Sequence, residues 1–213
     1  MVRKIVFQIP RETLEGDLER YRQTAIELGA TDAKVISSSQ VIIDERVRLK
    51  CIYPKCKWYG TNVNCPPYAV DLEIMKKALT KYNRAVFFML EAPSKDFVGP
   101  DVVKLGTHVK WTKKVYEITS KIESAAFYDG YHLAMGFAGG PCKSIFCPDK
   151  DCSALRPGCG CRHYLKSRSA MEGVGMDVFT MAARTGWEVY PCGASLKPED
   201  VPHGIRCGLI LIF

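Results

Sequence analysis

The chain has 213 residues, of which 47% are hydrophobic and 25% charged, and it carries a formal net charge of +7 at pH 7. This balance excludes a disordered or a fibrous protein. No apolar run reaches the roughly 18 residues that a membrane span needs, and the N-terminal stretch turns acidic too early for a signal peptide, so we expect a cytoplasmic protein.

The N-terminal half of the chain predicts two helices and three strands. Apolar residues at helical spacing predict a helix over 14–28, which a glycine ends. Runs rich in β-branched residues predict strands at 33–36 and 41–49. An aspartate suited to N-capping begins a predicted helix at 71–82, and the apolar run 85–90 predicts a buried strand.

The C-terminal half continues the alternation of helices and strands. An apolar stripe at helical spacing predicts one long helix over 102–128, followed by a strand at 131–137. A capping-box pattern, Ser-x-x-Glu, predicts that the next helix begins at residue 169. Two further strands are expected at 187–190 and 207–213.

Two irregular segments rich in cysteine, 51–68 and 141–164, interrupt this alternation. The simplest architecture is a single α/β (α+β) domain over 1–213, with a mixed β-sheet flanked by helices. Each cysteine-rich segment directly follows a predicted strand. We therefore expect the two segments to meet at one edge of the sheet.

The ten cysteines are the unusual feature of the composition. Disulfides are rare in the cytoplasm, and a chain of this length is stable without them, so metal or redox chemistry is the first hypothesis. Seven lie in polar loops rich in Pro and Gly, where core packing does not explain them. These seven are Cys51, Cys56 and Cys65 in the first segment, and Cys142, Cys147, Cys152 and Cys161 in the second.

The spacing of the cysteines favours iron–sulfur clusters over zinc. Structural zinc sites mostly use C-x2-C to C-x4-C pairs with histidine, whereas neither segment contains a C-x2-C pair. Four-residue gaps occur in plant-type iron–sulfur loops, and a proline follows both Cys65 and Cys147, as in ferredoxin sites. Zinc stays open as the alternative. The outlying Cys192 and Cys207 are read first as buried structural cysteines.

Several other polar residues are weighed as neighbours of a metal site. Arg162 and His163 follow a candidate ligand and are placed to donate hydrogen bonds near a cluster. His203 lies in a loop and is a similar candidate. His108, on the predicted long helix, and His132, in a predicted strand, are interpreted as structural.

The residues also resemble a known family. The similarity rests on DERVRLKC at 44–51, CPPY at 65–68, GGPCK at 139–143 and RSAMEGVGMDVF at 168–179, and it covers nearly the whole chain. The sequence resembles a prokaryotic family of cysteine-rich predicted metal-binding proteins of unknown function, common in anaerobes. The resemblance implies three ligands in the first loop and four in the second, with Cys159, Cys192 and Cys207 outside the shared pattern. It implies iron–sulfur clusters and supplies no reaction.

Three hypotheses about function follow. The first is a carrier of two [4Fe–4S] clusters that exchanges electrons with a redox partner protein in an anaerobic system. The second is an enzyme, because a three-cysteine cluster leaves one iron open unless Cys159, Cys192 or Cys207 completes it. The third is a zinc-stabilised module that binds nucleic acid. Two clusters would carry about −4 together, lowering the charge of +7 to about +3 and weakening this third hypothesis.

Overall fold

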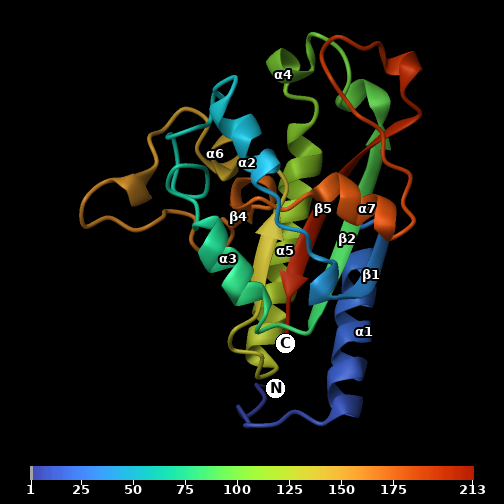
Figure 1. The fold of residues 1–213 in the computed structure, drawn as a ribbon, viewed down its shortest axis with the longest axis vertical. Helices are drawn as coiled ribbons and strands as arrows, with labels where there is room; N and C mark the ends of the chain where they lie inside the picture. Colours follow the sequence, from blue (N-terminus) through green and yellow to red (C-terminus); the bar gives the residue numbers. More distant parts are fainter. Residues whose placement is uncertain (1) are drawn as a thin grey trace.

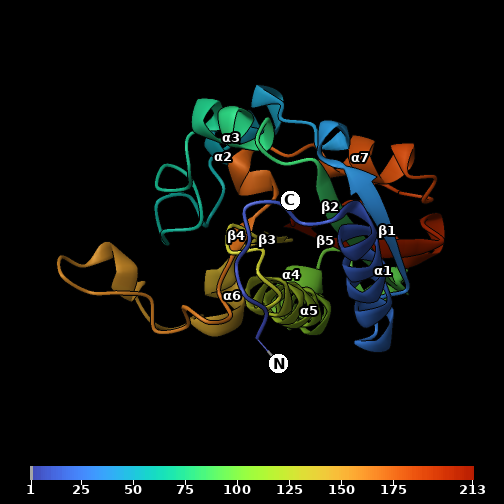
Figure 2. The same cartoon turned by 90° about the horizontal axis from the view of Figure 1, so that it is seen from below.

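The computed structural model describes residues 2–213, which form a mixed β-sheet with helices on both faces (Figures 1 and 2). The strands are β1 (Asp32–Ser37), β2 (Arg84–Pro93), β3 (Met135–Ala138), β4 (Ser169–Ala170) and β5 (His203–Leu211). Their order in the sheet is β1-β2-β5-β3-β4. All neighbours are antiparallel except β3 and β4, which are parallel. The fold is therefore α+β, as the sequence predicts.

The helices cover both faces of this sheet. They are α1 (Arg11–Glu27), α2 (Glu45–Ile52), α3 (Leu72–Leu79), α4 (Val102–Leu105), α5 (Val109–Tyr128), α6 (Cys142–Phe146) and α7 (Val178–Arg184). Helices α1 and α5 lie on one face, and α2, α3 and α7 lie on the other (Figure 2). Within residues 2–213, no helix is both long enough and apolar enough for a membrane crossing.

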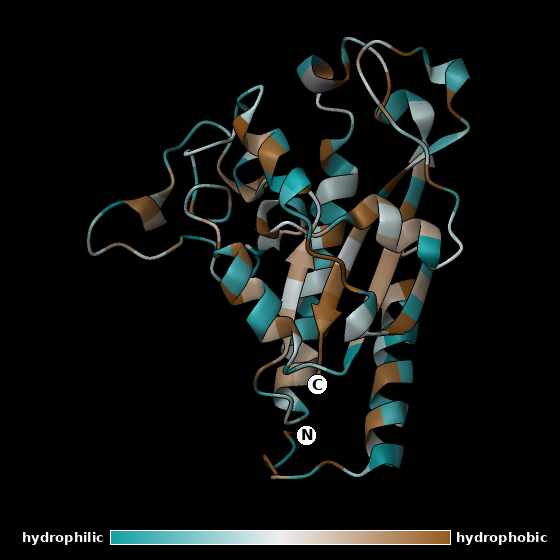
Figure 3. Cartoon of the chain, in the orientation of Figure 1, coloured by the Kyte–Doolittle hydropathy of each residue, from teal (hydrophilic) through white to brown (hydrophobic). Residues whose placement is uncertain are grey.

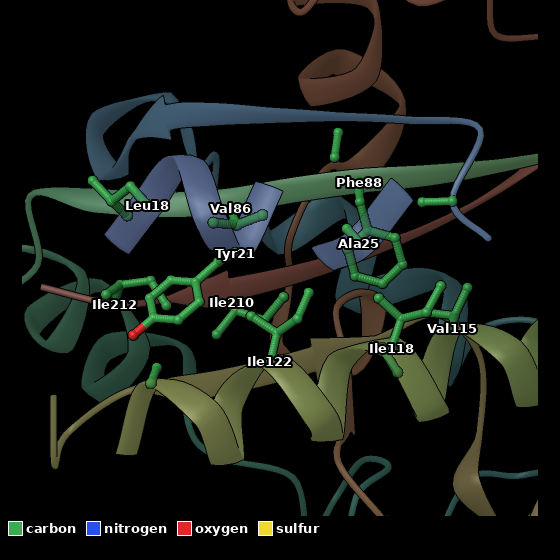
Figure 4. Packing of buried hydrophobic residues seen from close by; sticks show 14 of the residues in the cluster. Leu18, Tyr21, Ala25, Val86, Phe88, Val115, Ile118, Ile122, Ile210 and Ile212 are labelled. Atoms are coloured by element: carbon green, nitrogen blue, oxygen red, sulfur yellow. The ribbon is translucent and has the colours of Figure 1, made fainter. Parts of the chain in front are cut away.

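The central strands β2 and β5 carry the core of both faces. Successive side chains of a strand point to opposite faces, so Val86 and Phe88 pack toward α1 and α5, whereas Phe87 packs on the opposite face (Figure 4). Figure 3 shows the hydrophobic residues of β5 between helices whose surfaces are more hydrophilic. The ring of Phe88 packs directly against Gly208 of β5. A Cβ atom at position 208 would lie 2.4 Å from Cζ of Phe88.

Two predicted elements in the first half differ from the structure. The predicted strand at 41–49 is wrong: Asp44 accepts a hydrogen bond from the backbone N–H of Arg46 at 2.8 Å and caps α2 instead. Local capping thus overrides the β-branched run, of which only Ile43 forms a bridge, with Met176. The predicted helix at 71–82 is confirmed, with Asp71 as its N-cap, but it ends at Leu79.

Glycines account for two corrections in the second half. The long helix predicted at 102–128 is two helices, because Gly106 adopts a left-handed backbone with φ 65° and ends α4. The helix predicted to begin at 169 is β4 and a 3₁₀ turn, and α7 begins only at Val178, after Gly175 with φ 82°. Asp177 caps α7 through the backbone N–H of Thr180 at 3.1 Å.

Two short strand predictions are also incomplete. Residues 187–190 form no strand, because Trp187 turns inward and packs on Phe87, with ring centroids 4.8 Å apart. The strand predicted at 131–137 begins only at Met135, and His132 lies in the preceding turn. His108 lies between α4 and α5 rather than inside one helix.

A buried carboxylate fixes α1 against the N-terminal segment. Asp17 is 5% exposed and accepts hydrogen bonds from Arg3, from Arg20 at 2.6 Å and from the hydroxyl of Tyr131 at 2.8 Å. Burial opposes ionisation of this carboxyl, but the hydrogen bonds from Arg3, Arg20 and Tyr131 outweigh it and lower the pKa of Asp17 to about 2. The carboxylate is therefore charged in the folded protein over the ordinary pH range.

Replacing Asp17 by asparagine is expected to lower the free energy of unfolding by about 1–3 kcal/mol at pH 7. The folded pKa of about 2 lies below the unfolded value of about 3.9, so the carboxylate stabilises the fold above pH 4 or so. That contribution is lost as the pH falls from about 4 to about 2. Urea unfolding of both proteins across this range measures the difference.

The matched control is Glu19→Gln, which removes a carboxylate from the exposed surface of the same helix. Glu19 pairs with Arg22 at 2.6 Å, and its side chain is 61% exposed. An exposed pair of this kind contributes about 0–1 kcal/mol. Equal losses for the two variants at pH 7 would contradict the structural role given to Asp17.

Candidate metal centre

The two cysteine-rich loops lie side by side, next to the β4 edge of the sheet (Figures 1 and 2). Asn64 of the first loop donates a hydrogen bond to Oγ of Ser167 at 2.8 Å and accepts one from Oγ of Ser169 at 3.2 Å. The second loop leaves the sheet after β3 and returns to β4, its parallel neighbour, so both of its ends reach the first loop. The predicted meeting of the two loops is confirmed.

The second-loop set is defined as the four cysteines that line one small pocket: Cys142, Cys147, Cys152 and Cys161. The short helix α6 begins at Cys142 and is followed directly by Cys147. Ser153 holds the other two together: its hydroxyl donates to the carbonyl of Gly160 at 2.8 Å and accepts from the backbone N–H of Arg162 at 3.3 Å. The local fold thus turns four separated thiols toward one space.

Hydrogen-bond donors surround the sulfurs of the second-loop set. Asn64 Nδ2 lies 3.4 Å from Sγ of Cys142, and the backbone N–H of His163 lies 3.3 Å from Sγ of Cys161. Nη1 of Arg162 lies 3.9 Å from Sγ of Cys147. The guanidinium of Arg162 thus lies near a candidate ligand as expected, whereas His163 approaches Cys161 with its backbone N–H and not with its imidazole. Such donors favour the thiolate over the thiol, and the thiolate is the form that binds metal.

Burial acts in the opposite direction on Cys142. Its side chain is only 8% exposed, and burial raises the pKa of the thiol, while hydrogen bonds from Ser167 and Asn64 lower it. A bound metal removes this conflict, because it deprotonates a coordinating thiol outright. The ring of His163 stacks on Phe146 at 5.4 Å and closes the pocket beside the thiols.

The first-loop set is defined as Cys51, Cys56 and Cys65. Cys51 lies in the last turn of α2, and the backbone N–H of Cys56 donates to its carbonyl at 3.0 Å, so the chain folds back at once. Cys65 is 8% exposed. The pKa of the Cys65 thiol is raised to about 12, mainly by burial. Through Asn62, which accepts from the backbone N–H of Cys65 and lies 3.6 Å from the thiol of Cys142, this member of the first-loop set adjoins the second-loop set.

The comparisons with known proteins agree with a metal centre. Residues 34–212 match the family model described as "Predicted metal-binding protein (DUF2284)". The chain belongs to this family. No curated protein matches the chain, and no solved structure matches it. The resemblance noted in the sequence is confirmed, and the family description supplies metal binding without a metal or an activity.

The donor chemistry of this family member fits a soft metal. Both sets consist of thiols, the ligands of zinc and of iron–sulfur clusters. Within the described chain, no three Cys, His, Asp or Glu side chains are close enough together to hold a single metal ion. A metal cluster is larger than a single ion. The cysteines that would hold one are the second-loop set, around its pocket, and the first-loop set.

A second pocket, of about 370 Å³, opens beside the first-loop set. It is lined by Cys51 and Cys56 and also by Cys192 and Cys207, the two cysteines read first as structural. Cys207 is 3% exposed in β5, and Cys192 is exposed in the irregular segment that precedes this strand, with its Sγ 3.6 Å from the carbonyl of Tyr190. Cys159 is exposed and lines neither pocket.

Sequence reasoning missed several residues of the site. Asn62 is fully buried, and the thiol of Cys142 lies 3.6 Å from its Oδ1. Gly173 lets the first loop approach closely, since a Cβ atom there would lie 3.1 Å from the carbonyl oxygen of Asn64. The run TNVNC, with two amides before a cysteine, is the signal that could have been noticed. His203 lines neither pocket and lies 3.2 Å from the carbonyl of Glu188.

The loop junction predicts the effect of Asn64→Ala. This change removes the hydrogen bonds to Ser167, Ser169 and Cys142, and we expect a loss of about 1–3 kcal/mol in the stability of the loop region. Hydrogen exchange should accelerate together at 53–68 and 162–168, because each segment holds the other. Asn83→Ala, at an exposed position outside both loops, is the control. Faster exchange in the first segment alone would show that the loops are not coupled.

Proposed function

We propose that this protein binds two [4Fe–4S] clusters, one at each cysteine set, and transfers electrons within a larger redox system. The observation that carries the proposal is the second-loop set, in which four thiols line one pocket and three of the sulfurs have N–H donors. Four cysteines are the usual ligand set of such a cluster. Hydrogen bonds to the sulfurs are one means by which a protein adjusts the reduction potential of a cluster.

The contact between the two sets supports electron transfer. The side chain of Asn62 contacts the thiol of Cys142 in one set, and its backbone carbonyl accepts from the N–H of Cys65 in the other at 3.3 Å. One-electron exchange is the chemistry that the clusters supply when bound. The chain's own residues hold the two ligand sets on one junction, and the segment 147–161 forms an extended loop at the side of the molecule (Figure 1) that a redox partner protein can approach.

Anaerobic purification with metal and sulfide analysis tests this proposal. We expect about eight irons and eight acid-labile sulfides per chain, with a brown colour and a visible spectrum that bleaches on reduction. A colourless preparation that contains zinc and no labile sulfide would contradict the proposal and favour the zinc-stabilised module.

Substitution of single cysteines tests the division into two sets. Cys152→Ser and Cys56→Ser should each remove about half of the iron, and the double variant should remove nearly all of it. Cys159→Ser is the matched control, since this exposed cysteine lines neither pocket and should keep the full iron content. Complete loss of iron from one single variant would show one shared centre instead of two.

A second candidate is an enzyme with an open iron at the first-loop set. The observation that favours it is the 370 Å³ pocket, which reaches Cys51 and Cys56 and gives a small molecule access to their side. An iron with a free coordination position acts as a Lewis acid. Cys192 and Cys207 line the same pocket and could instead complete the ligand set.

The variants Cys192→Ser and Cys207→Ala distinguish an iron with a free coordination position from one whose ligand set a fourth cysteine completes. If both keep the full iron content and the wild-type spectrum, neither thiol is a ligand and the open-site enzyme is favoured. Loss of about half of the iron in either variant identifies the fourth ligand and favours electron transfer alone. Iron, sulfide and the EPR spectrum of the reduced protein are the measurements.

A further inference from the structure

The 370 Å³ pocket has the composition of a site for a small organic molecule. It lies between α2, the start of α7, the segment 187–192 and the first half of β5. Most of its wall is apolar or aromatic, with Phe97, Phe179 and Tyr190 among the lining residues. Its volume is at the small end of the roughly 300–1,000 Å³ typical of ligand pockets. A few polar groups on such a wall are what select the ligand.

Arg206 brings to the wall of this pocket a hydrogen-bond donor that has no acceptor in the described part of the chain. It lies on β5 and lines the pocket, and among residues 2–213 no acceptor is within hydrogen-bond reach of its buried Nε. Its guanidinium lies over the ring of Phe97, with Cζ 4.9 Å from the ring centroid. Burial lowers the pKa of Arg206, and the negative charge of the nearby Glu172 acts in the opposite direction. A buried, unpaired donor of this kind is costly unless something binds to it.

The two acidic residues of the pocket accept hydrogen bonds from other groups of the chain. Asp177 caps α7 and accepts from the backbone N–H and the hydroxyl of Thr180, at 3.1 and 2.6 Å. Oε2 of Glu172 accepts from the backbone N–H of Gly140 at 3.4 Å. Neither forms an ion pair with Arg206. Their two negative charges also make the pocket unfavourable for a dianion such as a phosphate ester.

Glycines keep the space around Arg206 and Phe97 free. A Cβ atom at Gly204 would lie 2.4 Å from Cδ2 of Phe97, so only glycine allows this ring to lie against β5 beneath the guanidinium. A Cβ atom at Gly139 would lie 3.1 Å from the carbonyl of Cys207 and 4.0 Å from Cδ of Arg206. These two glycines therefore leave the space in which Phe97 and the side chain of Arg206 lie.

We propose that this pocket binds a small monocarboxylate with an apolar body. The carboxylate pairs with the guanidinium of Arg206, which presents parallel N–H groups suited to a carboxylate. The apolar body packs against the aromatic side chains of a pocket that Cys51 and Cys56 also line. Only the presence of a metal centre beside the bound molecule rests on the proposed function, because the contacts to the carboxylate come from the chain itself.

Isothermal titration of the anaerobically purified full chain tests the proposal. The probes are phenylacetate and 3-methylbutanoate, and phenylacetamide is the neutral control of the same shape. We expect saturable binding of at least one carboxylate, and binding of the amide weaker by about tenfold or more. No saturation by either carboxylate up to about 10 mM, or equal binding of phenylacetate and phenylacetamide, would overturn the proposal.

Variants at Arg206 test its role. Arg206→Met keeps the length of the side chain and should weaken phenylacetate binding about 10- to 100-fold. It should not lower the melting temperature, because it removes a buried donor that has no acceptor among residues 2–213. Arg206→Lys keeps the charge, loses the paired N–H groups and should weaken binding less than Arg206→Met does. Arg84→Met, far along the chain and paired with Glu15 at 3.4 Å, should bind as the wild type does. Wild-type affinity in Arg206→Met would overturn the proposal.

Iron analysis of the same samples separates this inference from the proposed function. Carboxylate binding that depends on Arg206 in a protein without iron supports the pocket and contradicts the clusters. Two clusters without carboxylate binding, together with an altered EPR spectrum in Arg206→Met, would overturn the pocket: the cation then only offsets cluster charge. In that case the proposed function stands.

Discussion

The geometry of the candidate metal centre depends on the contact of one three-residue segment, 62–64, with the second loop. Asn62 is fully buried, and its Oδ1 accepts from the backbone N–H of Asn64 at 3.1 Å and lies 3.6 Å from the thiol of Cys142. Asn64 in turn bonds to Ser167 and Ser169. A buried amide that loses a partner is costly, so these contacts act as a unit. Without them, two irregular loops would have no fixed position relative to each other.

This junction gives the two cysteine sets different surroundings. The second-loop set has N–H donors at three of its sulfurs, including the guanidinium of Arg162. The first-loop set has the buried Cys65 on one side and the 370 Å³ pocket on the other. Hydrogen bonds to sulfur, burial and nearby charge are the factors that set the properties of a metal–thiolate centre. Two metal centres in one chain would therefore differ in reduction potential and in their access to small molecules, and so would suit different roles.

The sequence predicts the parts of this fold that depend on regular patterns. Helix α1 and strands β1, β2 and β5 follow from apolar spacing. The two loops meet as predicted, although the first follows helix α2 and not the strand on which that prediction rested. The errors arise where one local interaction decides, as with Asp44, which caps α2 inside a run that reads as a strand. Gly175, in its left-handed conformation, likewise ends the turn that the capping-box pattern assigns to a helix.

The seven candidate ligands could be selected from the sequence because cysteines in polar loops stand out against the rest of the composition. Asn62 and Asn64 could not, because their role depends on a contact with residues about eighty to a hundred positions away, and spacing along the chain carries no information about it. Arg206 was hidden for a different reason. It lies at the start of an apolar strand, where a charged residue reads as an edge position exposed to solvent.

Strand β5 joins the stable part of the molecule to the pocket. Its second half pairs with β2 and β3 and supplies Leu209 and Ile210 to the two faces of the core, so its position is fixed by packing. Its first half carries Arg206, whose Nε is buried, and the buried thiol of Cys207, whose pKa burial raises. Cys207 belongs to the hydrophobic core of its face, whereas the Nε of Arg206 has no acceptor among residues 2–213 and lies there at a cost. Polar groups placed on a rigid strand at a cost in stability are typical of binding sites.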